Sequence, residues 1–480
     1  MRPPDNAPGL TSKGQRARIA IDLGAESCRV SLLRLRDGSP HIELIHRIAN
    51  GPVQVDGALR WPFDAILSGL EDGLRKAAVV APEGVASIAV DGWAVDYVRL
   101  DADGAPVANP FCYRDERTVA AKEAADCIAP PEWMFAHTGT QPLRINTIYQ
   151  LLADQKQDAA WVNLPEYVLC WLGGRRVAEY TNATHTGLVD LATGDWSQEL
   201  IERLSLSRSA LPLIAPTGTV VGKVKGRFAE LDAFRDTDLI APACHDTASA
   251  IASIPSSLDK VAYICSGTWS LVGTRIASPI ATAEAMQAGF TNQGAAGGGF
   301  QFHTNVNGLW MVKRCLESWR NAGRPWTIEA LVAEAERRDD FLGTVDVDAA
   351  PLLLDEDMPT RLNEQLQARG HSTIEDCAGN EPLFARTIFE SLAARYVTAI
   401  RSLEKLLGER LLRIHILGGG AQNQLLTRLT AERTGLPVET GHTEGSTIGN
   451  FAVQLAAAES TDAAVRAEDI CRWARILERS

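Results

Sequence analysis

An ionisable pair, His245 and Asp246, stands in the segment 241–254, APACHDTASAIASI, between a short apolar strand and a run of small residues. A turn at this point would expose both side chains. The small residues after it would let a second backbone come close, which suits a helix at the seam between two halves of a protein. The alternative is that Asp246 only caps that helix by accepting a backbone N–H.

A second acid, Asp22, ends the apolar strand of the segment RIAIDLGAESCRVSLLRL, and a tight turn at Gly24 leads into another apolar run. Burying an aspartate on an apolar strand is costly unless it is paired or lies near a metal. Gly24 and Ser27 offer backbone N–H and hydroxyl donors of the kind that cradle phosphate. The pattern therefore predicts a hairpin with an acid at its mouth, and a plain structural hairpin is the alternative.

The segment 261–276, VAYICSGTWSLVGTRI, repeats this arrangement with a Ser266-Gly267-Thr268 turn. Two hairpins of one type, far apart in the chain, predict two similarly built halves that face each other. The first hairpin carries an acid and the second carries hydroxyls.

Other segments predict the elements that position these turns. Residues 85–100 predict two strands around Asp91-Gly92-Trp93. YRDERT, residues 113–118, leads into a helix over 116–128, and a solvated helix start explains its charges equally well. Short helices are expected over 146–152 and 166–172. YTNATHTGLVD, residues 180–190, is expected to be a loop beside the cleft, with simple turn chemistry as the alternative.

In the second half, the apolar spacing predicts helices over 305–319, 382–407, 446–458 and 463–477. LLRIHILGGGAQN, residues 411–423, predicts a strand that runs into three glycines and a helix. The glycines do not match the G-x-G-x-x-G pattern of dinucleotide-binding domains. They favour the approach of a flat ring or a phosphate to a helix N-terminus.

The composition is that of a globular protein: 480 residues, 45% hydrophobic and 22% charged, enough for two to four domains. A net charge of -13 argues against nucleic acid or an anionic membrane as a partner. Nine scattered cysteines without a C-x-x-C pair indicate neither disulfides nor zinc and favour the cytoplasm. The polar N-terminus lacks the apolar core of a signal peptide and is expected to be a disordered tail.

Together the motifs resemble those of the FGGY carbohydrate kinases and, within them, of the rhamnulokinases. The resemblance rests on IAIDLGAESCRV, HRIANGPV, DGWAVDYVRLDADG, YRDERT, EYTNAT, HDTASA, SGTWSLVG, TNQGA, NGLW, LGGGAQN and EGSTIGN, in this order. It implies an α/β fold of two actin-like (RNase H-like) domains with a cleft between them. The expected domains are a disordered tail (1–17), a mainly sugar-binding domain (18–253) and a mainly ATP-binding domain (254–480).

Carried over residue by residue, the resemblance makes Asp246 the catalytic base. It implies a sugar site of Ala94, His245, Asp246, Thr247 and Asn305. It implies an ATP site of Ala25, Glu26, Ser27, Cys28, Arg29, Thr268, Lys313 and Gly419. Asp22 and Asp246 would hold Mg²⁺. The partners expected are a sugar and ATP, with no nucleic acid and no membrane, for a monomer or a homodimer.

The sequence departs from the family pattern at four of these positions. Ala94 replaces a glycine that contacts the sugar in rhamnulokinases, and one methyl group can shift preference among isomers by about 1 to 3 kcal/mol. Glu26 and Cys28 stand where small residues are usual, and Glu26 is electrostatically awkward near phosphate unless it points outward. Lys313 replaces a glutamine and either favours the phosphates or is a solvated helix position.

The sequence thus predicts an ATP-dependent kinase that phosphorylates a ketose at O1, with L-rhamnulose as substrate. L-fuculose or another ketose is the alternative substrate. A non-catalytic ATP-binding regulator on the same fold is a different class of protein, and the presence of both Asp22 and Asp246 argues against it. A dinucleotide-dependent oxidoreductase resting on residues 417–423 is disfavoured by the glycine spacing.

Overall fold

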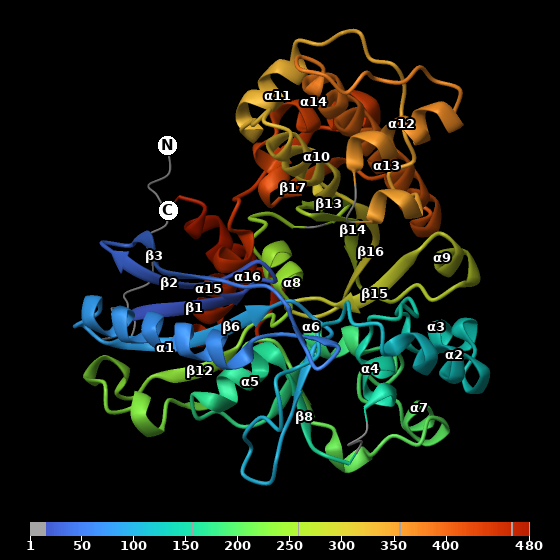
Figure 1. The fold of residues 1–480 in the computed structure, drawn as a ribbon. Helices are drawn as coiled ribbons and strands as arrows, with labels where there is room; N and C mark the ends of the chain where they lie inside the picture. Colours follow the sequence, from blue (N-terminus) through green and yellow to red (C-terminus); the bar gives the residue numbers. More distant parts are fainter. Residues whose placement is uncertain (1–15, 155–157, 258, 355–356, 462–463, 480) are drawn as a thin grey trace.

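The computed structural model describes residues 16–154, 158–257, 259–354, 357–461 and 464–479. Of the predicted N-terminal tail, residues 1–15 lie outside the described residues. Two six-stranded sheets organise the molecule (Figure 1). We call the body built on the first sheet the first lobe and the body built on the second sheet the second lobe.

The first sheet has the strand order β11-β12-β6-β1-β2-β3. Its strands β1, β2 and β3 are antiparallel neighbours, and β6 and β12 continue the sheet in parallel with β1. The strands are β1 (Ala17–Leu23), β2 (Ser27–Arg36), β3 (Ser39–Ala49), β6 (Val85–Gly92), β11 (Thr219–Lys223) and β12 (Asp238–Ala241).

The second sheet repeats this plan in the order β15-β16-β14-β13-β17-β18. Here β13, β14 and β16 are antiparallel, and β17 and β18 run parallel to β13. The strands are β13 (Val261–Ser266), β14 (Trp269–Ile276), β15 (Phe290–Gly294), β16 (Phe300–Asn307), β17 (Arg413–Leu417) and β18 (Val438–Thr440). The predicted pair of similar hairpins is confirmed as β1-β2 and β13-β14.

Helices cover the sheets and form separate cores. In the first lobe α1 (Phe63–Val80) and α5 (Leu164–Trp171) pack on one face of the sheet. In the second lobe the 27-residue α13 (Glu381–Leu407) crosses the sheet and ends at Gly408 in the left-handed conformation. It shares its core with α10 (Trp310–Asn321), α11 (Ile328–Glu336), α12 (Met358–Ala368) and α14 (Gln424–Thr434).

A third group of elements projects from the first lobe and has its own apolar core. It contains α2 (Thr118–Ile128), α3 (Pro131–Thr138), α4 (Thr147–Ala153), α7 (Gln198–Arg203), β7 (Tyr97–Arg99) and β8 (Trp161–Asn163). Smaller elements are β4 (Val53–Val55), β5 (Ala58–Arg60), β9 (Val177–Glu179), β10 (Leu213–Ala215), α6 (Tyr180–Ala183) and α9 (Ala283–Gln287).

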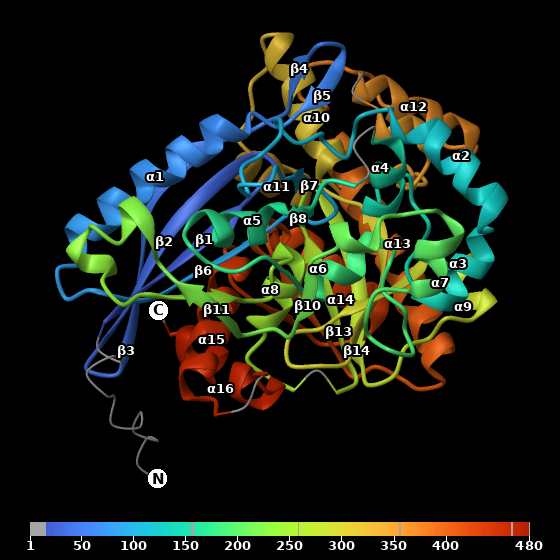
Figure 2. The same cartoon turned by 90° about the horizontal axis from the view of Figure 1, so that it is seen from below.

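The helices α15 (Gly445–Glu459) and α16 (Ala467–Leu477) return from the second lobe and pack beside β1 and β3 of the first, as both views show (Figures 1 and 2). One stripe of α15 is polar. Ser446 donates to Asp22 (3.1 Å), Asn450 donates to Asp91 (2.6 Å), and Gln454 donates to the carbonyl of Ile19 (3.0 Å). These three side chains of α15 thereby form hydrogen bonds with polar groups of β1 and β6.

The seam helix predicted after His245 is α8 (Asp246–Ala252), and it packs on α15. A Cβ added at Gly449 of α15 would overlap the backbone carbonyl of Ser249 in α8. The predicted close approach of a second backbone is therefore confirmed, and glycine on the partner helix makes it possible. Among the described residues, no helix combines the length and apolarity needed to cross a membrane.

Two predicted elements differ. The helix expected over 305–319 begins only at Trp310, because residues 300–307 form β16, which pairs with both β14 and β15. Tertiary pairing overrides the apolar spacing there. The loop expected over 180–190 begins with α6 and a 3₁₀ turn, Thr184–Thr186. Glu179 caps α6 by accepting from the backbone N–H of Thr181.

Candidate functional site

Three acids gather where the first sheet meets α8. Asp22 of β1 and Asp91 of β6 stand side by side in the parallel register, and the next residue of β6, Gly92, bridges to His245. The backbone N–H of Gly92 donates to the carbonyl of Cys244 (2.9 Å). Because Asp246 follows directly as the first residue of α8, all three carboxyls lie at one edge of the sheet.

Burial is the main cause of the raised pKa values of these three carboxyl groups. It raises the pKa of Asp246 to about 6, against two hydrogen bonds from Thr247. Burial also raises the pKa of Asp22 to about 6, opposed by the Arg29 guanidinium 2.9 Å away and reinforced by the Asp246 carboxylate. Burial and the charge of Asp22 hold the pKa of Asp91 well above its usual range. Negative charge on Asp246 opposes the ionisation of Asp22, and negative charge on both opposes the ionisation of Asp91. A bound cation would stabilise the charged forms of these acids.

The hydrogen bonds described for Asp246 all end on one oxygen. Oδ1 accepts from the backbone N–H of Thr247 (2.5 Å) and from its hydroxyl (3.1 Å). Nε2 of His245 lies 3.3 Å from the same oxygen. These contacts fix the carboxyl group through Oδ1, and the structure describes no hydrogen bond to Oδ2.

The predicted ATP loop is the turn between β1 and β2. Ala25, Glu26 and Ser27 form it, and Asn50 ties it down by donating to the carbonyl of Gly24 (2.9 Å). Cys28 is buried in the core of the first lobe, and this burial raises its pKa to about 12. Only its backbone can therefore contact a phosphate. Arg29 pairs with Asp22 and with Glu444 (3.4 Å).

The second lobe brings Thr268 and Gly419 together. Thr268 lies in the turn between β13 and β14, and Gly419 opens a 3₁₀ turn after β17. Gly418 has a φ of 79°, in the left-handed region that favours glycine. It also lies close to Ser266, so that a Cβ added to it would stand 2.8 Å from the Ser266 carbonyl oxygen. A Cβ at Gly420 would overlap the Ser266 hydroxyl. The glycines are needed because the two turns touch.

Glu26 does point outward, and it pairs across the lobes with Lys313 of α10 (2.6 Å). Both side chains are exposed, at 61% and 42%. Two of the four departures from the family pattern thus neutralise each other.

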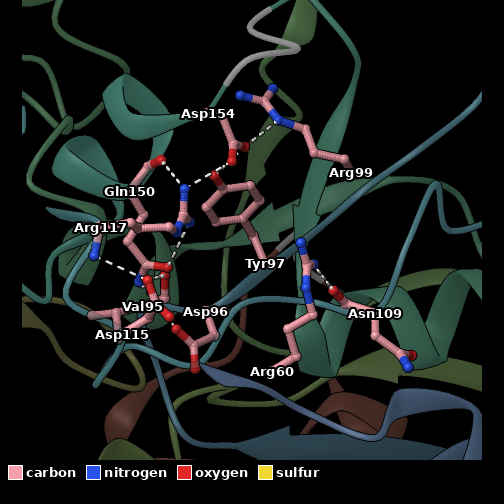
Figure 3. A network of polar contacts seen from close by, with 10 residues as sticks. All are labelled: Arg60, Val95, Asp96, Tyr97, Arg99, Asn109, Asp115, Arg117, Gln150 and Asp154. Atoms are coloured by element: carbon pink, nitrogen blue, oxygen red, sulfur yellow. Dashed lines mark hydrogen bonds and ion pairs between the residues drawn. The ribbon is translucent and has the colours of Figure 1, made fainter. Parts of the chain in front are cut away.

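Ala94 lies in a strained turn of the first lobe, shortly after the end of β6. Val95 has a φ of 70°, which is rare for a β-branched residue, and the N–H of Asp96 donates to the carbonyl of Ala94 (2.9 Å). Figure 3 shows what holds the turn: Gln150 donates to the Val95 carbonyl (3.2 Å) and to Asp96 (3.0 Å). Arg117 of the YRDERT segment joins Gln150 to Asp154 (Figure 3).

Asp96 anchors this turn to two tryptophans. Its Oδ2 accepts from the indoles of Trp61 (2.6 Å) and Trp93 (3.0 Å), and burial raises its pKa to about 6. The backbone at Ala94 is therefore held in a fixed place. YRDERT is more than a solvated helix start, because its Arg117 is half-buried within this network.

The structure places Asn305 on β16, exposed and paired with Leu271 of β14, and not at the start of a helix. Sequence reasoning assigned no role to Asp91, which belongs to the acid cluster, or to Ser446 and Asn450, which donate to its carboxylates. The signal for Asp91 was present, since it ends an apolar strand just as Asp22 does. Ser446 and Asn450 stand in the motif EGSTIGN, but their partners lie more than 350 residues away in the chain and could not be read from it.

Comparison with known proteins agrees with this geometry. The model of the FGGY family of carbohydrate kinases, N-terminal domain, matches residues 17–252, and the C-terminal domain model matches residues 262–458. A rhamnulokinase of Halalkalibacterium halodurans is 34% identical over 91% of this chain and 92% of its own. A rhamnulokinase of Oceanobacillus iheyensis is 32% identical over 95% of this chain and 97% of its own.

Solved structures show the same fold at low identity. A gluconate kinase of Lactobacillus acidophilus superposes with a TM-score of 0.75 at 16% identity, covering 96% of both chains. A xylulose kinase of Rhodospirillum rubrum gives 0.75 at 17%, covering 96% of this chain and 92% of its own. The fold is the predicted α/β fold of two actin-like domains. Matched by both domain models along most of its length, the chain belongs to the FGGY family of carbohydrate kinases.

Proposed function

We propose that this carbohydrate kinase transfers the γ-phosphoryl group of ATP to O1 of a ketose, with L-rhamnulose as the preferred substrate. The relatives named rhamnulokinase support the choice of sugar, since they match along nearly the whole chain. The observation that carries the reaction type is the place of Asp246: half-buried, beside Asp22, at the N-terminus of the seam helix α8.

In this proposal Asp246 accepts the proton of the sugar hydroxyl through Oδ2 as that oxygen attacks the phosphorus. A general base contributes about 10²- to 10⁴-fold to such a reaction. Alignment of the hydroxyl and stabilisation of charge supply the rest. The residues proposed for the sugar are Ala94, His245, Thr247 and Asn305. Those proposed for ATP are Thr268, Lys313, Gly419 and the turn 25–29.

Among the described residues, no group of three or more His, Cys, Asp or Glu side chains is placed to hold a metal ion, so the protein would offer a magnesium ion only the carboxylates of Asp22 and Asp246. Carboxylate oxygens are the ligands Mg²⁺ prefers, and it commonly takes one or two carboxylates, with water and substrate phosphates completing its shell. Asp22 and Asp246 would hold the ion, which supplies positive charge to the phosphates. Arg29 and Ser446 keep Asp22 oriented toward that position by hydrogen bonds.

We also propose that residues 18–253 bind mainly the sugar, that residues 254–480 bind mainly ATP, and that the enzyme works in the cytoplasm as a monomer or homodimer. The nine cysteines are all unpaired, which agrees with a reducing compartment.

The test is ADP release, measured by a coupled assay, across a panel of ketoses that includes L-rhamnulose and L-fuculose. We expect L-rhamnulose to give the highest kcat/KM and Asp246→Asn to lose at least about 10²-fold in kcat while binding ATP as tightly as the wild type. Preference for L-fuculose would overturn the choice of sugar. A fully active Asp246→Asn would exclude the role of Asp246, and tight binding of sugar and ATP without phosphorylation would favour a regulator.

A further inference from the structure

A polar cluster joins the two lobes directly beside the proposed base. His185, in the 3₁₀ turn after α6, places its ring 3.9 Å from the ring of His245, centroid to centroid. Gln293 of β15 reaches across from the second lobe, and its Nε2 lies 2.8 Å from Nδ1 of His185. Neither His185 nor Gln293 belongs to the residues assigned to the sugar above.

Three hydrogen-bonding atoms of this cluster are buried and have no partner among the residues that the structure describes. They are Nε2 of His185, Nδ1 of His245 and Oε1 of Gln293. The side chains of His245 and Gln293 are more than nine-tenths buried, at 6% exposure each. An unmade hydrogen bond at a buried polar atom costs about 1 to 3 kcal/mol, so three such atoms side by side indicate that a ligand completes them.

The contacts already made define which of these atoms donate. Burial holds the pKa of His185 well below its usual range. Each of the two rings has one nitrogen in contact with a neighbouring side chain and one without a hydrogen-bond partner among the described residues. The Gln293 amide donates to Nδ1 of His185, which leaves the proton of that ring on Nε2. His245 directs Nε2 at the Asp246 carboxylate, which leaves Nδ1 as an acceptor.

The cluster therefore offers one donor and two acceptors. A hydroxyl both donates and accepts, so vicinal hydroxyls of a sugar match this set, whereas a keto oxygen or an anion matches only the donor. The adjacent strand β16 extends the same polar face. Gln293 pairs with Gln301 of β16. Gln301, His303 and Asn305 follow one another at every second residue, which puts their side chains on one side of the strand.

Building on the proposed function, we propose that His185 is a specificity-determining residue that hydrogen-bonds a hydroxyl of the sugar together with His245. Gln293 orients the His185 ring from the second lobe. Because that hydrogen bond exists only when the lobes are together, sugar recognition and lobe closure depend on the same contact.

The test is a cycle of enzyme variants and sugars. Each substrate hydroxyl except the one phosphorylated is removed in turn, and kcat/KM is measured with wild type and with His185→Phe. We expect His185→Phe to raise the KM for sugar at least tenfold and leave the KM for ATP unchanged. For one deoxy sugar, the kcat/KM of the wild type should fall to the value that His185→Phe shows with the parent sugar. His185→Phe should show no further fall in kcat/KM with that deoxy sugar.

Further variants separate recognition from folding. His185→Gln keeps a donor near Nε2 and should recover part of the affinity, and Gln293→Leu should give a smaller loss than His185→Phe. His415→Phe is the matched control, since this buried histidine of β17 also has a ring nitrogen, Nε2, without a hydrogen-bond partner among the described residues, while its Nδ1 lies 3.5 Å from Glu439. It should change thermal stability but not the KM for sugar.

Additive losses for every deoxy sugar with His185→Phe would overturn the proposal and leave a structural role. If wild type phosphorylates no ketose, the proposed function fails, and the cycle is run on the carbohydrate that it does phosphorylate. The family assignment does not depend on which sugar that is.

Discussion

The two lobes share one architecture but differ in the chemistry at equivalent places. In each, a hairpin strand ends beside a glycine at the end of the neighbouring parallel strand: Gly92, the last residue of β6, lies against Leu23, and Gly418, directly after β17, lies against Ser266. In the first lobe the residue before Leu23 is Asp22, and in the second the residue before Ser266 is Cys265. Carboxylates therefore gather at the strand ends of the first lobe, and hydroxyls, a thiol and glycines stand at the equivalent places of the second.

This difference teaches how a duplicated fold divides a reaction. In the proposed mechanism, proton acceptance and cation binding need acids, and the first lobe supplies Asp22, Asp91 and Asp246. The turns proposed for the anionic nucleotide in the second lobe, at Thr268 and Gly419, carry hydroxyls and glycines instead. The four predictions below test that division, from the largest effect to the smallest.

Substitution of the strand-end residue should lower kcat when it is made at Asp22 in the first lobe but not when it is made at the equivalent Cys265 in the second. We expect Asp22→Asn to lower kcat about 10²- to 10³-fold, as for other groups that stabilise charge in the transition state, and to raise the Mg²⁺ concentration needed for activity. Cys265→Ser should change kcat little. Steady-state kinetics over a Mg²⁺ titration makes the comparison, and equal losses in both variants would contradict the division of roles.

The pH dependence should follow the acids of the first lobe. Asp246 must be ionised to accept a proton, and its pKa is raised to about 6. The value of kcat/KM should therefore be constant above about pH 7 and fall at least tenfold per pH unit below about pH 6. A kcat/KM that is measured at constant ionic strength and stays constant down to pH 5 would show that neither Asp246 nor Asp22 has a pKa of about 6.

Neighbouring glycines of the second lobe should separate stability from nucleotide binding. Gly420→Ala would place a Cβ on the Ser266 hydroxyl, so we expect a loss of about 1 to 3 kcal/mol in the free energy of unfolding. At Gly419 an added Cβ meets nothing within 4 Å. Gly419→Ala should keep the stability of the wild type and raise only the KM for ATP, as thermal melts and kinetics would show.

The pair Glu26 and Lys313 should have the smallest effect. An exposed ion pair contributes about 0.2 to 1 kcal/mol, so each single variant should change the KM for ATP by no more than about fivefold. Glu26→Gln should lower that KM, since it removes a negative charge beside the phosphates and releases Lys313. Lys313→Gln should raise it. If the double variant equals the sum of the single ones, the two side chains do not act as a pair.

The sequence predicted the features that depend on neighbours in the chain. The two hairpins, the 382–407 helix and the small residues of α8 follow from local patterns, and the structure confirms them. Asn305 was assigned to a helix because a strand in the middle of a sheet can show the same apolar spacing, and only pairing with β14 and β15 decides between them.

The candidate site was predictable where residues belong to a motif and unpredictable where two distant segments meet. Asp22 and Asp246 could be singled out, and the structure brings them together. The pairing of Glu26 with Lys313 and the approach of Gln293 to His185 depend on how the lobes lie against each other. Cys28 illustrates a further limit, because a residue inside a binding motif can direct its side chain into the core.

The return of α15 to the first lobe has a consequence for biosynthesis. Asp22 leaves the ribosome 424 residues before Ser446, its hydroxyl partner, and Asp91 precedes Asn450 by 359 residues. The carboxylates of a nascent first lobe therefore lack these two hydrogen bonds until α15 has been translated and has folded back onto β1 and β6.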